Sequence, residues 1–373
     1  MANDDVQPKS SELSQTSPSS SSVNADQPIS DSHVIDEIKP PTAPSLFSRA
    51  VARVVRGGVG LKNFVYDSGL ADSLKLHTPV ISVGNLTMGG TGKTPVVNWI
   101  LDHYRQSNTK VTVVGRNYKA RRKGISRVDP GQPRAAYEFG DEPTLTAINH
   151  PEVSVYVGPS KYMTALEAER LSKPQVIVVD DGFQHRALHR DLDLVLIDAT
   201  STFQDYEIFP KGKSREPWGS LERANWVLLT KTNFVDELKI EEWYRMMPTG
   251  ARVLELSYRL KSDFMSEAGM RAVGFAGLAK PISFQQSLQN DAMYDVVGFI
   301  PFPDHYRYTQ ADVDFIEKQR LDLGAEVILT TEKDWVKVKD LGVNMDHYRA
   351  LSLEVHAMGP EGEFHASLDR LLN

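Results

Sequence analysis

The stretch that decides the fold is VISVGNLTMGGTGKTP (80–95). Residues 80–84 form a predicted buried strand, and Pro95 suits the first turn of a predicted helix over 94–105. The loop between them matches the phosphate-binding pattern G-x-x-x-x-G-K-[ST], although Thr87 replaces the first glycine. Backbone N–H groups of such a loop hold the phosphates of a nucleotide. The predicted nucleotide-binding residues are Thr87, Met88, Gly89, Gly90, Thr91, Gly92, Lys93 and Thr94.

Two of these residues suggest the cofactors. The Lys93 ammonium can reach the β- and γ-phosphates of ATP, and the Thr94 hydroxyl can bind Mg²⁺. The sequence therefore predicts an ATP- and Mg²⁺-dependent protein.

Short apolar runs alternate with helical segments on the C-terminal side of this loop. Such runs of valine, isoleucine and leucine are typical of a parallel sheet covered on both faces. The predicted fold class is therefore α/β, with a P-loop NTPase-type parallel sheet domain over 79–240. The further predicted strands are 110–115, 153–157, 175–181, 192–198 and 225–230, and the further predicted helices are 141–149 and 160–171.

A second series of strands and helices begins near residue 272 and predicts a second, smaller α/β domain over 250–373. The polar region 231–250 is expected to contain the junction. The predicted strands are 271–277, 294–300, 325–331 and 348–354, and the predicted helices are 281–289, 309–323 and 332–339.

The N-terminal part of the chain differs from the rest. Residues 1–44 contain ten serines, six prolines and no aromatic residue, so we expect a disordered tail. Within the segment 45–78, a predicted amphipathic helix (46–56) ends at Gly57, Gly58 and Gly60. Its apolar side could lie on an anionic membrane or on the protein's own core, and the residues alone leave both open. Phe47, Val51, Val54 and Val55 form the apolar side, and Arg49, Arg53 and Arg56 form the other.

The composition excludes several classes of protein. The chain has 373 residues, a formal net charge of −7 and no cysteine. The acidic balance argues against a nucleic-acid partner, and disulfides, thiolate metal sites and cysteine nucleophiles are excluded. The N-terminus has no secretory signal pattern, and no apolar run approaches the length of a membrane span. We therefore expect a chain that faces a reducing, cytoplasmic compartment, and no obligate protein partner is evident.

Acidic residues follow one of the predicted strands. Asp180 and Asp181 end the run QVIVVDD (175–181), where a phosphoryl-transfer site needs a carboxylate to hold Mg²⁺. Asp198, at the end of 192–198, is a competing candidate. Gln184 and His185 come directly afterwards and could orient the metal or a phosphate.

Four further segments supply candidates for the acceptor side, where a kinase needs a base and cations. Each also has an ordinary structural interpretation, such as a helix cap or a surface ion pair. The candidates are Asp141 and Glu142 in GDEP (140–143), Arg215 and Glu216 in KSREP (213–217), His305 in PFPDHYRYT (301–309), and Arg116 and Tyr118 after the strand 110–115.

The order of these motifs resembles that of the tetraacyldisaccharide 4'-kinase family, the lipid A 4'-kinases of Gram-negative bacteria. The resemblance covers roughly residues 44–360. The matching segments are VGNLTMGGTGKTP (83–95), GDEP (140–143), VDDGFQH (179–185), HRDLDLVLID (189–198), REP (215–217), FPDHY (302–306) and TTEKDWVKV (330–338).

The resemblance implies transfer of the γ-phosphate of ATP to the 4'-hydroxyl of a tetraacylated glucosamine disaccharide 1-phosphate. It implies a second, Rossmann-like domain, a base Asp141 assisted by His305, and Mg²⁺ at Asp180 and Asp181. It also implies that the N-terminal helix binds the lipid and the cytoplasmic face of the inner membrane, where the protein would be peripheral. Lys93, Arg215 and Glu216 join the implied catalytic residues, and Arg116, Tyr118, Gln184 and His185 are the candidates for substrate binding.

Two segments depart from the family pattern. The family has S-R-G-Y-G where this chain has GRNYK (115–119), and P-A-G-P-L-R-E-P where it has PKGKSREP (210–217). The missing glycine removes backbone freedom beside Arg116.

A nucleotide-dependent switch or partitioning-type ATPase is the alternative function. The deviant loop of partitioning ATPases carries a lysine directly before the two glycines, where this chain has Met88. The segment TKTN (230–233) resembles the guanine-reading motif [NT]-K-x-D, but Asn233 replaces its aspartate. A membrane adaptor without enzymatic activity would leave the phosphate loop without a purpose.

Overall fold

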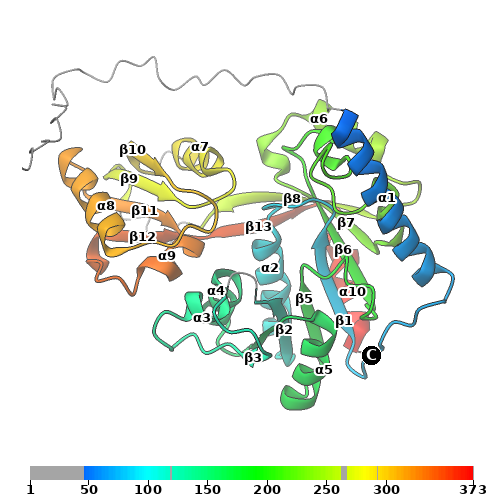
Figure 1. The fold of residues 1–373 in the computed structure, drawn as a ribbon. Coiled ribbons are helices and arrows are strands. Elements are labelled where there is room, and N and C mark those ends of the chain that lie inside the picture. Colours follow the sequence, from blue (N-terminus) through cyan, green and yellow to red (C-terminus); the bar gives the residue numbers. More distant parts are fainter. Residues whose placement is uncertain (1–45, 118–119, 262–266, 292, 373) are drawn as a thin grey trace, which may run out of the picture. The chain divides into compact units, whose positions relative to one another are not determined.

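The computed structural model describes residues 46–117, 120–261, 267–291 and 293–372. In these ranges, nine strands form a larger sheet and four form a smaller one (Figure 1). The larger sheet has the order β13-β8-β7-β6-β1-β5-β2-β4-β3. Its strands are β1 (Val80–Asn85), β2 (Val111–Arg116), β3 (Ser126–Arg127), β4 (Ser154–Gly158), β5 (Val176–Asp180), β6 (Leu192–Asp198), β7 (Trp226–Thr230), β8 (Val253–Leu260) and β13 (Leu353–Met358).

The larger sheet is mostly parallel, which confirms the α/β fold class. Its two outermost pairs, β3 with β4 and β13 with β8, are antiparallel. Strand β1 lies between β5 and β6, and its register pairs Val83 with Asp180 and Asn85 with Leu196. The carboxyl ends of these three strands therefore meet at one edge, where open α/β sheets bind ligands.

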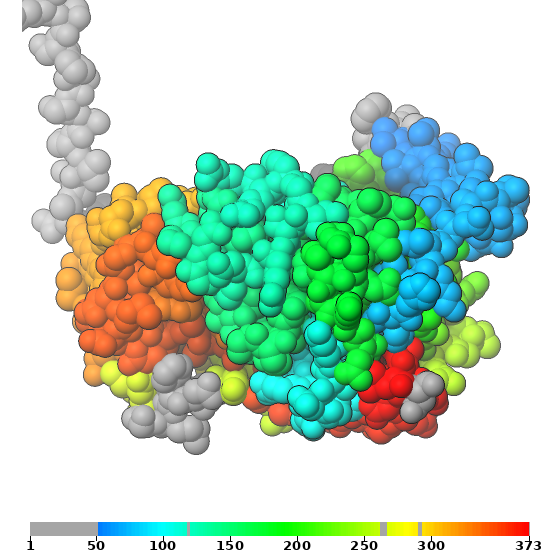
Figure 2. Space-filling view, turned by 90° about the horizontal axis from the view of Figure 1, so that it is seen from below, coloured from blue at the N-terminus to red at the C-terminus, as the bar shows by residue number. Residues whose placement is uncertain are grey.

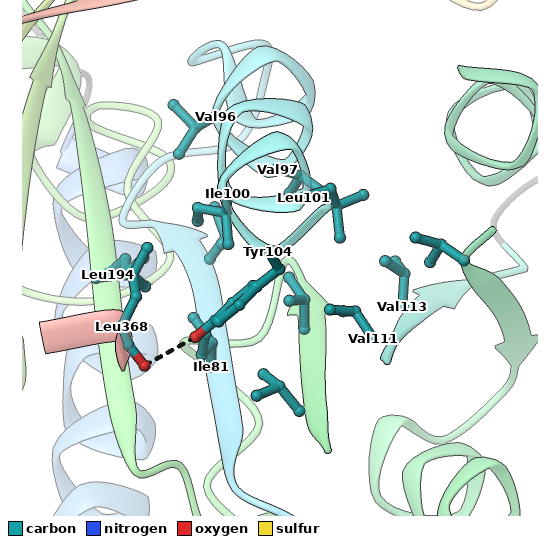
Figure 3. Close-up of a cluster of buried hydrophobic side chains, with 14 of the residues drawn as sticks. Ile81, Val96, Val97, Ile100, Leu101, Tyr104, Val111, Val113, Leu194 and Leu368 are labelled. Atoms are coloured by element: carbon teal, nitrogen blue, oxygen red, sulfur yellow. Dashed lines mark hydrogen bonds between the residues drawn. The ribbon is translucent and has the colours of Figure 1, made fainter. Parts of the chain in front are cut away.

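Helices cover both faces of this sheet. On one face, α2 buries Val96, Ile100 and Tyr104 against the strands, and the Tyr104 hydroxyl donates to the Leu368 carbonyl oxygen at 3.0 Å (Figure 3). On the other face, α5 packs through Ala165 and Ala168. The described helices of this part are α1 (Leu46–Asp67), α2 (Lys93–Gln106), α3 (Ala135–Phe139), α4 (Asp141–Asn149), α5 (Lys161–Ser172), α6 (Glu237–Met246) and α10 (Glu361–Asp369).

The smaller sheet has the order β10-β9-β11-β12, and all of its pairs are parallel. One face packs against Val313 and Ile316 of α8, and the other packs against Phe284 and Leu288 of α7. Its elements are β9 (Arg271–Ala276), α7 (Pro281–Asp291), β10 (Asp295–Pro301), α8 (Gln310–Asp322), β11 (Val327–Thr331), α9 (Glu332–Val338) and β12 (Tyr348–Leu351).

The segment 250–373, expected to form the smaller domain, contributes to both sheets. Strands β8 and β13 pair with each other and extend the larger sheet (Figure 1). The single strand predicted over 348–354 divides at Ser352 into β12 and β13, which belong to different sheets. Phe364 and Leu368 of α10 lie in the core of the larger sheet, and Figure 2 shows the red C-terminal residues beside cyan ones. The smaller sheet is thus an insertion between β8 and β13.

The predicted end of the first helix was wrong. Helix α1 continues through Gly57, Gly58 and Gly60 to Asp67. Its C-terminal half is held by tertiary contacts, because Arg186 bonds the Asp67 carboxylate at 2.7 Å and the Asn63 carbonyl oxygen at 3.2 Å. These contacts outweigh the helix-propensity cost of the glycines, roughly 1 kcal/mol for each residue. Among the described residues, no helix is long and apolar enough to cross a membrane.

Candidate active site

The glycine-rich loop joins β1 to α2 as the sequence predicts. Gly92 has a φ of 87° and directly precedes α2, with no side-chain hydrogen bond capping the helix. A Cβ atom at this position would lie 2.5 Å from the Tyr258 hydroxyl oxygen. Glycine is therefore required here by both the left-handed backbone and the close approach of β8. The uncapped first turn leaves backbone N–H groups for an anion.

Neighbouring strands hold the outward-facing carbonyl groups of this loop. The Thr230 hydroxyl donates to the Thr91 carbonyl oxygen at 3.1 Å, and the Tyr258 hydroxyl donates to the Gly92 carbonyl oxygen at 2.8 Å. The Lys231 ammonium lies 3.4 Å from the Gly90 carbonyl oxygen. These contacts within the protein restrict the conformation of the loop, which reduces the entropy cost of nucleotide binding.

Lys93 lies in a compact polar cluster at the ends of β1 and β5. Its ammonium nitrogen is 3.3 Å from the Asn85 amide oxygen and 3.7 Å from an Asp181 carboxylate oxygen. The Arg215 guanidinium donates to both Asp181 oxygens, at 2.9 and 2.7 Å, and to Asn85 at 2.6 Å. The structure therefore brings together three predicted site residues around Asn85, which the sequence analysis did not single out.

The two acids after β5 have different surroundings. Asp181 adopts a φ of 57°, a conformation that non-glycine residues rarely adopt and that is enriched at functional sites. Burial raises the pKa of Asp181, but the hydrogen bond from Arg215 and the Lys93 charge outweigh it and hold the pKa well below its usual range. The Asp181 carboxylate is therefore ionised and already engaged by two cations.

Asp180 is partly buried, and its Oδ1 atom, which is itself buried, has no hydrogen-bond partner in the described part of the chain. Burial and the nearby Glu142 carboxylate raise the pKa of Asp180 to about 6. The ammonium of Lys161, a buried residue, donates to the Asp180 backbone carbonyl oxygen. An unpartnered buried oxygen suits a cation that binds with the nucleotide, because such an atom is costly to bury alone.

Asp198, the competing candidate, is engaged elsewhere. Its carboxylate accepts from Lys231 at 2.6 Å and from the Thr200 hydroxyl at 2.6 Å.

Asn233 forms two hydrogen bonds with the Tyr258 backbone: its amide nitrogen donates to the carbonyl oxygen at 2.9 Å, and its amide oxygen accepts from the N–H group at 2.8 Å. An aspartate could supply only the acceptor, so the asparagine in TKTN fixes β8 beside the phosphate loop.

The acceptor side forms where the start of α4 meets the loop that follows β10. Asp141 begins α4, and its Oδ2 atom lies 2.9 Å from the Nδ1 atom of His305, which follows β10 and has a φ of 56°. Burial raises the pKa of Asp141, but the hydrogen bond from His305 and the charge of Lys333 outweigh it and hold the pKa well below its usual range. Since the carboxylate is ionised, it accepts the hydrogen bond and His305 donates it.

The loop containing Arg215 pairs with the start of the phosphate loop. The Met88 N–H group donates to the Lys213 carbonyl oxygen at 2.8 Å, and that of Arg215 donates to Leu86 at 2.7 Å. Glu216 points elsewhere: it is 2% exposed and accepts from Arg223 at 2.8 Å and from Asn63 of α1 at 3.4 Å. Glu216 therefore links this loop to α1.

Three of the other predicted substrate-binding residues, Gln184, His185 and Arg116, lie around the same edge of the sheet. The Gln184 side-chain amide donates to the Asn85 backbone carbonyl oxygen at 2.8 Å, and the Gln184 backbone carbonyl oxygen accepts from Lys62 at 2.7 Å. Burial lowers the pKa of His185 to about 4, with the Lys161 charge acting in the same direction. Arg116 ends β2. Tyr118 lies outside the described residues.

The residues present fit a magnesium ion. Within the described ranges, no cluster of three or more His, Cys, Asp or Glu side chains could hold a metal. Mg²⁺ is usually bound by one or two carboxylates together with nucleotide phosphates and water, so a larger cluster is not required. The unpartnered Asp180 oxygen and the Thr94 hydroxyl near the start of α2 are hard oxygen ligands of the kind this ion prefers.

Comparison with known proteins gives a consistent result. A family model described as Tetraacyldisaccharide-1-P 4'-kinase (LpxK) matches residues 45–373. A tetraacyldisaccharide 4'-kinase from Bdellovibrio bacteriovorus is 37% identical, covering 84% of this chain and 95% of its own. One from an Anaeromyxobacter species is 34% identical, covering 85% and 89%.

The solved structures include a similar protein. The crystal structure of LpxK from Aquifex aeolicus in complex with ATP has a TM-score of 0.70 and 29% identity, covering 87% of this chain and 98% of the other. The range matched by the family model, residues 45–373, includes both sheets of the present chain. The chain belongs to the tetraacyldisaccharide-1-P 4'-kinase family.

Proposed function

We propose that this protein transfers the γ-phosphate of ATP to the 4'-hydroxyl of a tetraacyldisaccharide 1-phosphate, a step of lipid A biosynthesis. The hydrogen bond between Asp141 and His305 carries this proposal. A nucleotide-dependent switch needs no base for an acceptor alcohol, whereas a kinase does. The switch is therefore not favoured.

The phosphate loop and the polar cluster of Lys93, Asp181 and Arg215 bind the nucleotide and stabilise the charge on its phosphates. Backbone N–H groups of residues 87–94 hold the phosphates, and Lys93 contacts the terminal phosphoryl group. Asp181 fixes both Lys93 and Arg215, so that two cations face the charge that develops on the transferring oxygens. Contacts within the protein hold both cations, which limits reorganisation during the reaction.

Asp141 acts as the base toward the acceptor hydroxyl. Its carboxylate takes the proton of the 4'-hydroxyl as the oxygen of that group bonds to phosphorus and the bond to ADP breaks. His305 holds the carboxylate in place and keeps it ionised. A weakly basic carboxylate is sufficient, because the transition state of phosphoryl transfer is loose and catalysis is mainly positioning.

Asp180 and Thr94 would hold Mg²⁺, which supplies neutralisation of the β- and γ-phosphate charge when it is bound. The different surroundings of the two acids support this division. Asp181 is committed to Lys93 and Arg215, whereas Asp180 keeps an oxygen available.

Helix α1 is the proposed lipid-binding element at the cytoplasmic face of the inner membrane. Four large apolar side chains on or directly after it are exposed: Val54 (76%), Leu61 (65%), Phe64 (61%) and Leu70 (73%). Its other side reaches the site, because Lys62 bonds the Gln184 carbonyl oxygen and Asn63 bonds Glu216. An acyl chain on the exposed stripe would therefore have its sugar headgroup close to the catalytic edge.

The test is acceptor-dependent ADP release with tetraacyldisaccharide 1-phosphate, Mg²⁺ and detergent. We expect labelled γ-phosphate on the lipid, and we expect Lys93→Ala to remove most of it. A slow hydrolysis that is independent of lipid would instead identify a switch.

A further inference from the structure

Lys333 is a cation beside the proposed base, Asp141, and neither the sequence motifs nor the proposed mechanism gives it a role. It lies in the first turn of α9, and its ammonium nitrogen is 3.0 Å from Glu142 Oε1 and 4.0 Å from Asp141 Oδ2. Its side chain is 19% exposed. A mostly buried lysine from the smaller sheet thus contacts both acids in the first turn of α4.

The position of α9 does not depend on Lys333. The next residue, Asp334, is fully buried and accepts from the Gly277 N–H group at 2.9 Å and the Tyr308 hydroxyl at 3.1 Å, and it forms an ion pair with the Lys337 ammonium at 2.6 Å. Tyr308 belongs to the same segment as His305, so one carboxylate connects α9 with the loop that carries this histidine. The contacts of Asp334 therefore fix the positions of Lys333 and His305 relative to each other.

Other contacts keep α9 next to α4. The Asn149 amide at the end of α4 donates to Glu332 at 3.3 Å, and the Arg134 N–H group before α3 donates to Asp340, two residues after α9, at 3.0 Å. Figure 2 shows the orange segment and the teal segment of the chain side by side. Asn149 at the end of α4 therefore contacts Glu332, and Glu142 at its start contacts Lys333. These two contacts restrict the position of α4 and of the acids in its first turn.

We propose that Lys333 is a positioning residue for the phosphoryl transfer, which holds the Asp141–Glu142 pair and aligns Asp141 with His305. This inference rests on the proposed function. The groups that face Asp141 are Glu142 on α4, Lys333 and Lys337 on α9, and His305 after β10. Without Lys333, the Glu142 carboxylate would lack its cation, and Asp141 would lose one of the positive charges that hold it.

The neighbouring charges agree with this geometry. Burial lowers the pKa of Lys333, but the carboxylates of Glu142 and Asp141 outweigh it and raise the pKa above its ordinary value. Lys333 is therefore permanently charged at neutral pH. A permanent positive charge is suited to holding two carboxylates in position, whereas a proton donor would need a pKa near neutrality.

The experiment compares Lys333→Met and Lys333→Arg with the parent chain. We expect Lys333→Met to lower kcat about 10- to 100-fold, the range that a small displacement of a catalytic group produces. The Kd for ATP and the Tm should change little, and Lys333→Arg should recover most of the turnover. Lys318→Met, which removes an exposed lysine from α8, is the matched control for charge and should behave as the parent.

A double-mutant cycle identifies the partner. In a Glu142→Gln background, Lys333→Met should cost much less than in the parent, because the two side chains act as one unit. Full activity of Lys333→Met, or a loss of kcat that follows a loss of Tm and is not rescued by arginine, would overturn the inference. If the parent itself phosphorylates no lipid, the proposed function fails instead.

Discussion

The Nδ1 atom of His305 lies 2.9 Å from the Oδ2 atom of Asp141, although 164 positions separate the two residues. Each comes from a different sheet: Asp141 begins α4 beside the larger sheet, and His305 follows β10 of the smaller one. The proposed base and the group that holds it are therefore supplied by different parts of the fold. If these roles are right, substitutions at the boundary between these parts should affect turnover more than nucleotide binding.

Asp141→Asn should lower kcat about 10²- to 10⁴-fold, because the amide keeps the shape of the side chain but cannot accept the proton of the acceptor. The Kd for ATP should stay within about twofold of the parent value, since Asp141 is not part of the phosphate loop. Lipid phosphorylation and calorimetric titration of an ATP analogue measure the two effects. Asp322→Asn, an exposed acid at the end of α8, is the control. A weakened ATP affinity with normal kcat would show that Asp141 is not the base.

Asp180→Asn should raise the Mg²⁺ concentration needed for half-maximal activity by about tenfold or more, because it replaces the carboxylate that keeps an unpartnered oxygen. Asp198→Asn should leave this concentration unchanged and lower the Tm, because it weakens the buried pair with Lys231. Activity measured over a range of Mg²⁺ concentrations separates the two acids. The opposite pattern would move the metal site to Asp198.

His185 should make the protein less stable in mild acid. Its folded pKa, about 4, lies below the ordinary value of 6.5, so the unfolded chain binds more protons between these pH values. The free energy of unfolding contributed by this group is complete above pH 6.5 and falls as the pH decreases toward 4. His185→Gln should reduce this loss by about 1 kcal/mol, after allowance for partial exposure. Urea unfolding at several pH values tests this, with the exposed His356→Gln as the control.

The triple variant Val54→Ser, Leu61→Ser and Phe64→Ser should reduce association with anionic vesicles by about tenfold or more, because it removes the exposed apolar stripe of α1. The Tm should not fall, since these side chains are already exposed. Leu238→Ser, at a residue 70% exposed on α6, is the control for surface hydrophobicity. Vesicle sedimentation that is the same for the triple variant and the parent would remove α1 from the membrane-binding surface.

Local pattern was sufficient to predict much of this fold. The strand over 80–84, the glycine-rich loop and the helix over 94–105 follow one another in the structure with boundaries shifted by one residue. Alternation of apolar strands and helices likewise predicts the parallel order of the sheet. These features depend on neighbours in sequence, which periodicity and turn composition report directly.

Pairing between distant segments could not be read from the sequence. Strand β8 follows the polar region expected to be a junction, and β13 directly follows β12 in the chain although it lies in the other sheet. In the site, Asn85 and Lys333 acquire their roles only from partners supplied by other elements. Lys333 lies inside the quoted motif TTEKDWVKV, but no local rule distinguishes it from a solvated helix lysine.

The insertion of the smaller sheet between β8 and β13 has a consequence for synthesis of the chain. The ribosome makes the phosphate loop before the insert, whereas Phe364 and Leu368, which pack in the core of the same sheet as that loop, follow the insert in the chain. The core of the larger sheet therefore cannot be completed before the whole insert has been translated.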